Sequence, residues 1–351
     1  MRGVAALMVV IYHYSGGFLP AINPAEATGL IAKSYLWVDF FFILSGFVIA
    51  HGYGAQFKGV PRGRDLLAFL RERLARLYPL HLVMLALLLA LELLKVGLRI
   101  TGVPGSVNEP FGATTSWNAF FSNLLLLQTT GTQDQLTWNG PSWSIGAEWF
   151  AYLLFPLLMP LMIRTRWLSR LALVAVAMVG LFLISRGDSL DVTFDYGLVR
   201  CVLEFGLGVI TYRLFKERKG GVIGHDVLCV LLGVALLASM HWEAPDLAFP
   251  ILSCALILSL AQNQGRVTRA LTVRPLVYLG TISYSVYMSH FVVLQYIQTT
   301  SHAVQDAGIG RALTADQSVG LLGLLVLAIL ALSHFLYHWI ETPARRYLVQ
   351  T

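Results

Sequence analysis

The sequence predicts an all-α membrane protein that crosses the bilayer several times, and three observations support this fold class. Hydrophobic residues make up 56% of the 351 residues, whereas charged residues make up only 13%, about half the share found in soluble domains. The mean hydropathy is +0.68, so a soluble fold of this length would leave much apolar surface exposed to water. The apolar residues also fall in runs long enough to cross a bilayer.

Ten apolar runs of about 17 to 25 residues are long enough to span a hydrocarbon core of roughly 30 Å as helices. They cover residues 3–19, 36–53, 79–97, 146–163, 168–185, 196–214, 224–240, 247–262, 278–298 and 317–339. The segment 120–128 is also apolar, but it is too short to cross and contains Asn123. We expect this segment to lie in the interface or to re-enter the membrane.

The basic residues determine the predicted orientation, because loops rich in lysine and arginine stay on the cytoplasmic side. With a cytoplasmic N-terminus and ten crossings, most of the 25 basic residues fall in cytoplasmic loops. Arg200 lies within a span. The basic residues on the outer side are Lys33, Lys95, Arg99, Arg186 and Arg311. An eleventh crossing would invert every later loop, so we expect ten spans with both termini in the cytoplasm.

The chain is interpreted as one domain over residues 1–351, with no soluble appended domain. The longest polar segments are interpreted as loops: 54–78, 98–118 and 129–145. The apolar stretch Val4–Tyr12 has the length of a signal-peptide core, but no small-x-small cleavage site follows it. We therefore expect the first run to be a retained span.

Composition argues against several kinds of site. The three cysteines, Cys201, Cys229 and Cys254, are widely spaced and indicate neither a disulfide framework nor a zinc site. His334 and His338 have the spacing of metal ligands, but we expect no bound metal. The net charge of +6 is explained by topology, so nucleic acid is not an expected partner.

Ionisable side chains inside a span are costly, and each is therefore a functional candidate. The predicted spans contain His13, Asp39, Glu148, Arg200, Glu204, His290 and His334. Arg2 and His13 are separated by about three helical turns, so they share one face and lie roughly 16 Å apart along it. This spacing predicts the arginine at the cytoplasmic end and the histidine beyond the midplane.

Asp39 is predicted at an outer depth similar to that of His13. A carboxylate beside a histidine fixes its tautomer and stabilises the imidazolium, as a general base requires. We therefore predict His13 as a general base and Asp39 as the carboxylate that orients it. Glu148, at the outer end of the fourth span, is a further catalytic candidate. The alternatives are a structural histidine that joins helices and an aspartate that caps a helix.

Two features of the sixth run are interpreted as structural. Arg200 and Glu204 have i, i+4 spacing, so we expect them to pair with each other. The sequence FGLG at 205–208 is expected to allow close helix packing, since no strand precedes it and no nucleotide-loop lysine follows.

Arg73 and Arg76 lie three residues apart on one face of the amphipathic segment LLAFLRERLARLYP, which leads into the third run. Two guanidinium groups on one helix face can hold a phosphate or pyrophosphate. The alternative is that these basic residues only fix the topology and contact anionic lipid.

Aromatic residues gather near the outer ends of the fourth and ninth runs. Trp138, Trp143 and Trp149 are candidates either for the interfacial aromatic belt or for contacts with an acceptor. Tyr287 and His290, in SYSVYMSHF, share a polar face that either lines a site or joins neighbouring helices.

With these pieces in view, the chain resembles the acyltransferase-3 family of integral membrane acyltransferases. The matching pieces follow the family order: RGVAALMVVIYH at 2–13, VDFFFILSGFVI at 38–49, RERLARLYP at 71–79, PSWSIGAEWFAYLLFP at 141–156, ISYSVYMSHF at 282–291 and HWIETPARR at 338–346. The first two together are the most specific. The fourth departs from many relatives, which have a second acidic residue and EQFY in place of AEWFAYLLFP.

The resemblance implies about ten helices, a cytoplasmic acyl-coenzyme A donor and a hydroxyl acceptor reached from the other side. It assigns functional positions to Arg2, His13, Asp39, Arg73, Arg76 and Glu148. We thus expect a bacterial inner-membrane O-acyltransferase, foremost an O-acetyltransferase, that uses acetyl-coenzyme A as co-substrate and has no tightly bound cofactor. Arg2, Arg73 and Arg76 would hold the coenzyme phosphates.

In this hypothesis His13, oriented by Asp39, deprotonates an acceptor hydroxyl that attacks the thioester. A covalent acyl-enzyme through Ser45 or Tyr287 is a variant of this route. Trp143, Tyr287 and His290 would bind the carbohydrate or other acceptor. Membrane lipid is an expected partner, and the sequence leaves a homodimer open.

Two other classes of protein compete with the enzyme. The first is a proton-coupled transporter or flippase of a lipid-linked sugar, in which His13 and Asp39 form a proton relay. The second is a non-catalytic membrane scaffold. The halves of the chain show no repeat of the kind that many carriers have, and a scaffold would not need a histidine and an aspartate inside the membrane.

Overall fold

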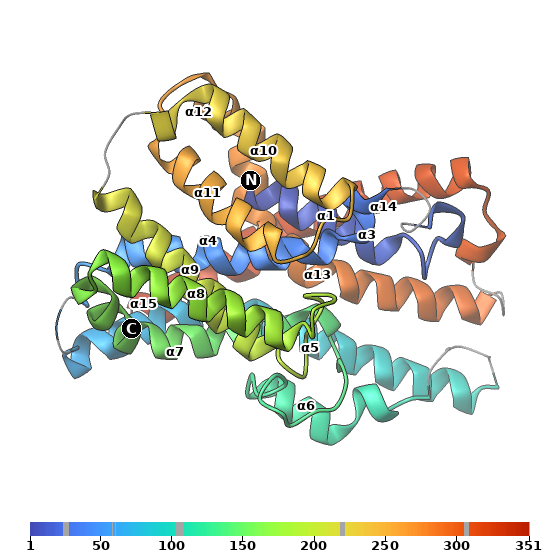
Figure 1. Ribbon diagram of the computed structural model, residues 1–351. Coiled ribbons are helices and arrows are strands. Elements are labelled where there is room, and N and C mark those ends of the chain that lie inside the picture. Colours follow the sequence, from blue (N-terminus) through green and yellow to red (C-terminus); the bar gives the residue numbers. More distant parts are fainter. Residues whose placement is uncertain are drawn as a thin grey trace.

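The computed structural model describes residues 1–350 apart from 24–27, 58, 60, 103–108, 218–221 and 305–308. In these ranges the chain is helical and forms no β-sheet, and the long helices lie side by side along one common direction (Figure 1). The α-helices are α1 (Arg2–Tyr14), α3 (Gly29–Ala32), α4 (Trp37–Tyr53), α5 (Gly63–Ile100), α6 (Trp117–Leu124), α7 (Trp143–Arg164), α8 (Trp167–Ile184), α9 (Gly197–Glu217), α10 (Asp226–His241), α11 (Ala248–Gln262), α12 (Arg266–Leu271), α13 (Arg274–Val304), α14 (Ala315–Leu336) and α15 (Thr342–Gln350).

Each predicted apolar run coincides with a helix, and five helical stretches are long and apolar enough to cross a membrane. These are Ser34–Tyr53, Gly63–Ile100, Trp167–Ile184, Arg274–His302 and Ala315–Val349. The chain is therefore a multi-pass membrane protein, while ten crossings and cytoplasmic termini stay predictions. Helix α6 has eight residues, so it is too short to cross a bilayer by itself.

Helices α1 and α5 differ from the runs that predicted them in ways that bear on the site. Helix α1 ends at Tyr14, five residues before the end of the predicted run, because Gly16 turns the chain with a φ of 76° and Pro20 follows soon after. Helix α5 has 38 residues and passes through Pro79 without a break. The amphipathic segment that carries the arginines and the membrane span are therefore one continuous helix.

Helices α4 and α9 form the closest contact in the core. A Cβ atom on Gly46 would lie 2.0 Å from the carbonyl oxygen of Phe205, and one on Gly208 would lie 2.0 Å from that of Ile43. Only glycine allows two backbones to approach so closely, a common device between membrane helices. The interpretation of FGLG as packing glycine is confirmed.

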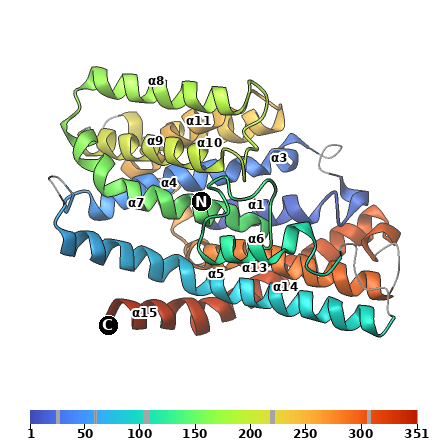
Figure 2. The same ribbon diagram turned by 90° about the horizontal axis from the view of Figure 1, so that it is seen from below.

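Two further contacts position the site. Helix α1 packs along α13, and the Tyr14 hydroxyl donates a hydrogen bond to the His290 carbonyl oxygen at 2.8 Å. At one end of the bundle α15 lies alongside α5 (Figure 2). The five-residue π-helix Tyr337–Glu341 joins α14 to α15, and π-helical turns of this kind occur often at functional sites.

Candidate functional site

A cavity of about 420 Å³ lies between α1, α4, α13 and the loops that precede α7 and α9. We call it the outer cavity, because it lies at the end of the bundle that the sequence predicts to face outward. Its aromatic and titratable lining residues are Tyr12, His13, Tyr35, Trp138, Trp143, Asp191, Arg200, Tyr287 and Phe291. Trp138 has a left-handed backbone with a φ of 52°. Its backbone N–H donates to the Thr114 carbonyl oxygen at 2.9 Å, and its indole N–H donates to that of Ser116 at 3.2 Å. This indole is therefore fixed in the cavity wall at a backbone position that costs energy.

His13 contacts a second histidine rather than a carboxylate. Its Nδ1 lies 2.9 Å from the Val9 carbonyl oxygen and 3.4 Å from Nε2 of His290. Nδ1 of His290 in turn lies 3.3 Å from the Val286 carbonyl oxygen. Since a carbonyl oxygen only accepts, we assign Nδ1–H to both rings. His290 Nε2 is then an acceptor for His13 Nδ1–H.

This tautomer leaves Nε2 of His13 with a free lone pair in a residue that lines the outer cavity. The arrangement is able to take a proton from a hydroxyl group held there. His290 is fully buried and is not among the described lining residues. The prediction that His290 contacts the acceptor stays a prediction, and the contact that the structure gives its ring is with His13.

Among the described residues, no hydrogen bond or ion pair joins Asp39 to His13. Arg200 donates from Nε to Asp39 Oδ1 at 2.9 Å and from Nη2 to Asp39 Oδ2. Both side chains are fully buried. Because both carboxylate oxygens bind the guanidinium, the prediction that Asp39 orients His13 directly is not supported by the geometry.

The prediction that Arg200 and Glu204 pair with each other is wrong. The arginine uses its N–H groups on Asp39, on the Val192 carbonyl oxygen at 3.0 Å and on that of Tyr35 at 3.4 Å. Both Glu204 oxygens are buried and accept no hydrogen bond from a described residue. Arg200 therefore joins three separate segments instead of its neighbour one turn away.

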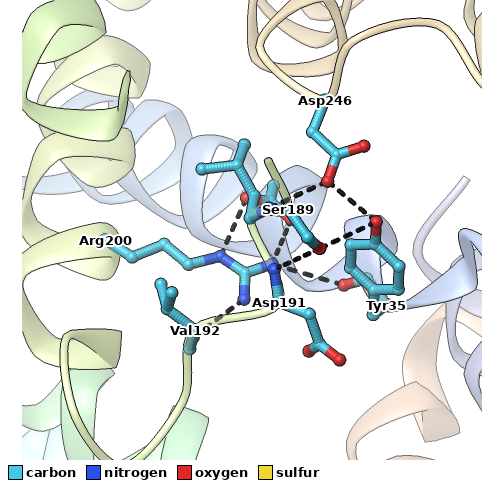
Figure 3. Close-up of polar contacts among 8 residues, drawn as sticks. Tyr35, Ser189, Asp191, Val192, Arg200 and Asp246 are labelled. Atoms are coloured by element: carbon cyan, nitrogen blue, oxygen red, sulfur yellow. Dashed lines mark hydrogen bonds and ion pairs between the residues drawn. The ribbon is translucent and has the colours of Figure 1, made fainter. Parts of the chain in front are cut away.

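The polar contacts around Arg200 continue through Tyr35 to Ser189 and Asp246 (Figure 3). Asp246 accepts hydrogen bonds from the Tyr35 hydroxyl at 2.8 Å and from the Leu190 backbone N–H at 2.8 Å. Ser189 donates to the Tyr35 hydroxyl at 3.1 Å. These contacts fix the loop between α8 and α9, which places Asp191 in the cavity wall. Asp191 is open to the cavity, yet the surrounding protein removes enough water to raise the pKa of its carboxyl group.

A middle cavity of about 50 Å³ adjoins the outer one, since Val38 and Tyr287 line both. Its polar lining residues are Arg2, Ser144, Glu148, Ser283, Tyr284 and Tyr287. Glu148 accepts hydrogen bonds from the hydroxyl groups of Tyr152, at 2.5 Å, and Ser45. Arg2 and Glu148, which were predicted as site residues from the sequence, thus share one cavity.

An inner cavity of about 480 Å³ lies between α5, the π-helix and α15. It is lined by Glu72, Arg76, Tyr337, Glu341, Thr342, Arg345, Arg346 and Val349. Arg76 forms an ion pair with Glu341, and its guanidinium carbon lies 5.4 Å from the ring centre of Tyr284. Tyr284 also lines the middle cavity. The three cavities therefore follow one another through the bundle.

Of the remaining residues predicted for the site, some line one of the three cavities and others do not. Arg73 donates to the Tyr53 hydroxyl at 2.6 Å and lies over the Tyr53 ring, outside the described lining of the inner cavity. Trp143 and Tyr287 line the outer cavity as predicted, whereas Trp149 does not. Ser45 lines neither the outer nor the middle cavity.

Sequence reasoning missed several lining residues. Tyr12, Tyr35 and Asp191 reach the outer cavity, and Arg345 and Arg346 reach the inner one. The arginines lie in the segment HWIETPARR, which was noted as a match without a role. Asp191 lies in a loop, and its sequence gives no periodic signal that would place it beside α1.

The fold and site define a membrane protein in which a histidine lines an aromatic cavity, a small middle cavity adjoins it, and an arginine-lined cavity lies next to the middle one. The family model described as an acyltransferase domain matches residues 1–338. The chain belongs to this acyltransferase-3 family and is a membrane acyltransferase.

Among curated relatives, the chain is 29% identical over 339 residues to the acyltransferase MdmB of Streptomyces mycarofaciens, covering 89% of this chain and 81% of that protein. It is 35% identical over 156 residues to protein 2 in the picA locus of Rhizobium radiobacter, covering 42% of this chain and 73% of that protein. It is 24% identical over 374 residues to the O-acetyltransferase OatA of Staphylococcus aureus, covering 99% of this chain but only 56% of OatA. No solved structure matches.

Proposed function

We propose that this protein is a bacterial inner-membrane O-acyltransferase that moves an acetyl group from cytoplasmic acetyl-coenzyme A to a carbohydrate hydroxyl on the other side of the membrane. The observation that carries the proposal is the series of three cavities, with arginines at one end and His13 at the other. The O-acetyltransferase activity named for OatA agrees with it.

The donor would enter from the inner cavity. Coenzyme A is a long, thin molecule with phosphates at one end and the thioester at the other, which fits a narrow passage between two wider cavities. Arg2 and His13 lie roughly 16 Å apart along α1, and each lines a different cavity of the series. A phosphate group held near Arg2 and Arg76 would thus allow the thioester to reach His13.

The reaction follows from the His13 tautomer. Nε2 takes the proton of the acceptor hydroxyl as its oxygen attacks the thioester carbonyl carbon, so the new C–O bond forms. The C–S bond then breaks, and the coenzyme thiolate receives the proton from Nε2. His290 Nε2 and the Val9 carbonyl oxygen would hold Nδ1–H throughout, so His290 is a positioning residue in this proposal.

The acceptor would lie in the outer cavity. Trp138, Trp143 and Tyr12 supply aromatic surface against which a sugar ring can stack. Asp191 supplies a carboxylate that can accept hydrogen bonds from hydroxyl groups. This combination favours a carbohydrate over a purely apolar acceptor.

A covalent route through an acyl-enzyme is the variant to test. Of the two candidate hydroxyl groups, that of Tyr287 fits better, because Tyr287 lines both the middle and the outer cavity and Ser45 lines neither. Direct attack needs no such step and is the route that we favour.

The test measures transfer of radiolabelled acetyl from acetyl-coenzyme A to bacterial polysaccharides and to methyl glycosides, with the protein in liposomes. We expect His13→Gln to lower the rate by about 10²- to 10⁴-fold. His51→Gln is the matched control, because His51 is an exposed histidine in the last turn of α4 and does not line the outer cavity. Transfer at the wild-type rate by His13→Gln would contradict the proposed base. Movement of an acceptor across the membrane without acetylation would favour a transporter.

A further inference from the structure

We propose that α5 and α15 form a phosphate-binding site in the inner cavity, with Arg345 and Arg346 as its main ligands and the 3′-phosphate of coenzyme A as its occupant. This inference rests on the proposed function, because it takes acyl-coenzyme A as the donor. It shifts the phosphate site from the arginines that sequence spacing indicated to a pair on the C-terminal helix.

The charges that line the inner cavity leave these two arginines uncompensated. Glu341, which is 2% exposed, is paired with Arg76 and accepts a hydrogen bond from Ser285 at 3.0 Å. Glu72 accepts one from Tyr53 and lies 3.7 Å from Arg73. Both carboxylates that line the cavity are thus already partnered.

Arg345 and Arg346 form no hydrogen bond or ion pair with a residue that the structure describes. Two unpaired guanidinium groups on one cavity wall attract an anion. Phosphate is the anion whose oxygens best match the planar fork of donors that arginine presents.

The fold holds the two arginines in place. Helix α15 packs along α5, and Arg71 on α5 donates a hydrogen bond to the Leu348 carbonyl oxygen on α15. At the start of α15, the buried pair between Glu341 and Arg76 ties the π-helix to α5. The arginines are therefore attached to a docked helix rather than to a free tail.

The position of the inner cavity indicates which phosphate of coenzyme A would lie near Arg345 and Arg346. Arg76 is the residue through which the inner cavity adjoins Tyr284 and the middle cavity, so the coenzyme arm would pass beside it. Arg345 and Arg346 line only the inner cavity among the three. The group nearest them would be the one farthest from the thioester, which in coenzyme A is the phosphorylated ribose.

Two phosphate sources share this chemistry, the coenzyme and the headgroup of an anionic lipid. The experiment therefore compares coenzyme A with dephospho-coenzyme A, which lacks only the 3′-phosphate, on purified full-length protein in a neutral detergent. A parallel series adds phosphatidylglycerol. The variant is Arg345→Gln with Arg346→Gln. The control is Arg62→Gln with Arg64→Gln, two exposed arginines at the start of α5.

We expect the wild type and the control to bind coenzyme A about tenfold to a hundredfold more tightly than dephospho-coenzyme A, as the loss of charged hydrogen bonds predicts. The α15 variant should bind the two equally, at the dephospho-coenzyme A level. Unchanged melting temperatures without ligand would show that the variant is folded.

Three outcomes would overturn the inference or its basis. If the α15 variant still discriminates between the two coenzymes, the site is wrong while the proposed function stands. If the variant loses only a stabilisation by phosphatidylglycerol, the site binds lipid and not the donor. If the wild type binds neither coenzyme, the proposed donor itself is wrong.

Discussion

The outer cavity of about 420 Å³ and the inner cavity of about 480 Å³ are similar in size, but their walls differ in chemistry. The outer wall has two tryptophans, three tyrosines, His13, Asp191 and the carboxylate-bound Arg200, whereas the inner wall has one tyrosine, three arginines and two carboxylates that already have partners. A wall of the first kind suits a neutral molecule rich in hydroxyl groups, and one of the second kind suits a phosphorylated one. The difference agrees with the proposal that the donor and the acceptor enter from opposite ends.

Each cavity also has an arginine paired with a buried carboxylate, and the two pairs differ in exposure. Arg200 and Asp39 are both 0% exposed, whereas Arg76 is 20% exposed and Glu341 is 2% exposed. The outer arginine also binds two backbone carbonyl groups. The outer pair therefore fixes helices, while the inner arginine remains within reach of a ligand.

The largest effect is expected from breaking the outer pair. Arg200→Met should lower the free energy of unfolding by about 3–5 kcal/mol, since it leaves Asp39 charged and buried. The melting temperature in detergent measures this, with Arg166→Met, an exposed arginine before α8, as control. The double variant Asp39→Asn with Arg200→Met should recover much of the loss. An equal loss in single and double variants would show that the ion pair is not the cause.

The packing of α4 against α9, which supports the outer cavity, gives the second test. Gly208→Ala should cost about 1–3 kcal/mol, because the added methyl group meets the Ile43 carbonyl oxygen. Gly233→Ala in α10 meets nothing within 4 Å and should be neutral or slightly stabilising. Chemical or thermal unfolding of both variants in the same detergent measures this difference. A similar free energy of unfolding for the two variants would contradict the close contact between α4 and α9.

The histidine pair gives the third test and concerns only the outer cavity. His290→Leu removes one of the two acceptors of His13 Nδ1–H, leaving the Val9 carbonyl oxygen, and should lower kcat by about tenfold to a hundredfold, less than the loss of His13 itself. The KM for acetyl-coenzyme A should not change, because the proposed site for the donor phosphates is the other cavity. His290→Gln, which retains an acceptor, should recover part of the rate. A raised KM with unchanged kcat would instead indicate a contact with substrate.

The smallest effect concerns Asp191, and its sign follows from the raised pKa. The folded protein holds the Asp191 proton more tightly than the unfolded chain does, so stability falls as pH rises from about 4 through the folded pKa. Asp191→Asn should remove this decline, by less than about 1 kcal/mol. The variant would then be slightly more stable than the wild type at pH 7 and equal to it near pH 3. Thermal unfolding across this range checks the prediction, and a variant less stable at pH 7 would contradict it.

The helices were largely predictable from the sequence, because apolar runs bounded by glycine, proline or charge determine them locally. The run 36–53 and helix α4 at Trp37–Tyr53 differ by one residue. The first run was predicted too long, since Gly16 and Gly17 are compatible with a span but here form a turn. Helix α5 shows that a proline near the start of a span need not end the helix.

The candidate site was predictable only in part. The depth of ionisable residues identified His13, Arg2 and Glu148, which the structure places along one series of cavities. It did not identify the partners of these residues, because helical spacing reports neighbours on one helix and not those across helices. The i, i+4 spacing predicts that Arg200 pairs with Glu204 one turn away. The long arginine side chain instead reaches Asp39 on another helix.

The narrowness of the middle cavity has a consequence for the cell. A protein open from both faces of a membrane would leak protons and ions and dissipate the gradients that the membrane stores. A space of about 50 Å³ has room for few water molecules, so it cannot support a wide aqueous path between the two larger cavities. Tyr287 and Val38 line both the middle and the outer cavity, so in the proposed function they would limit this leak whenever no donor is bound.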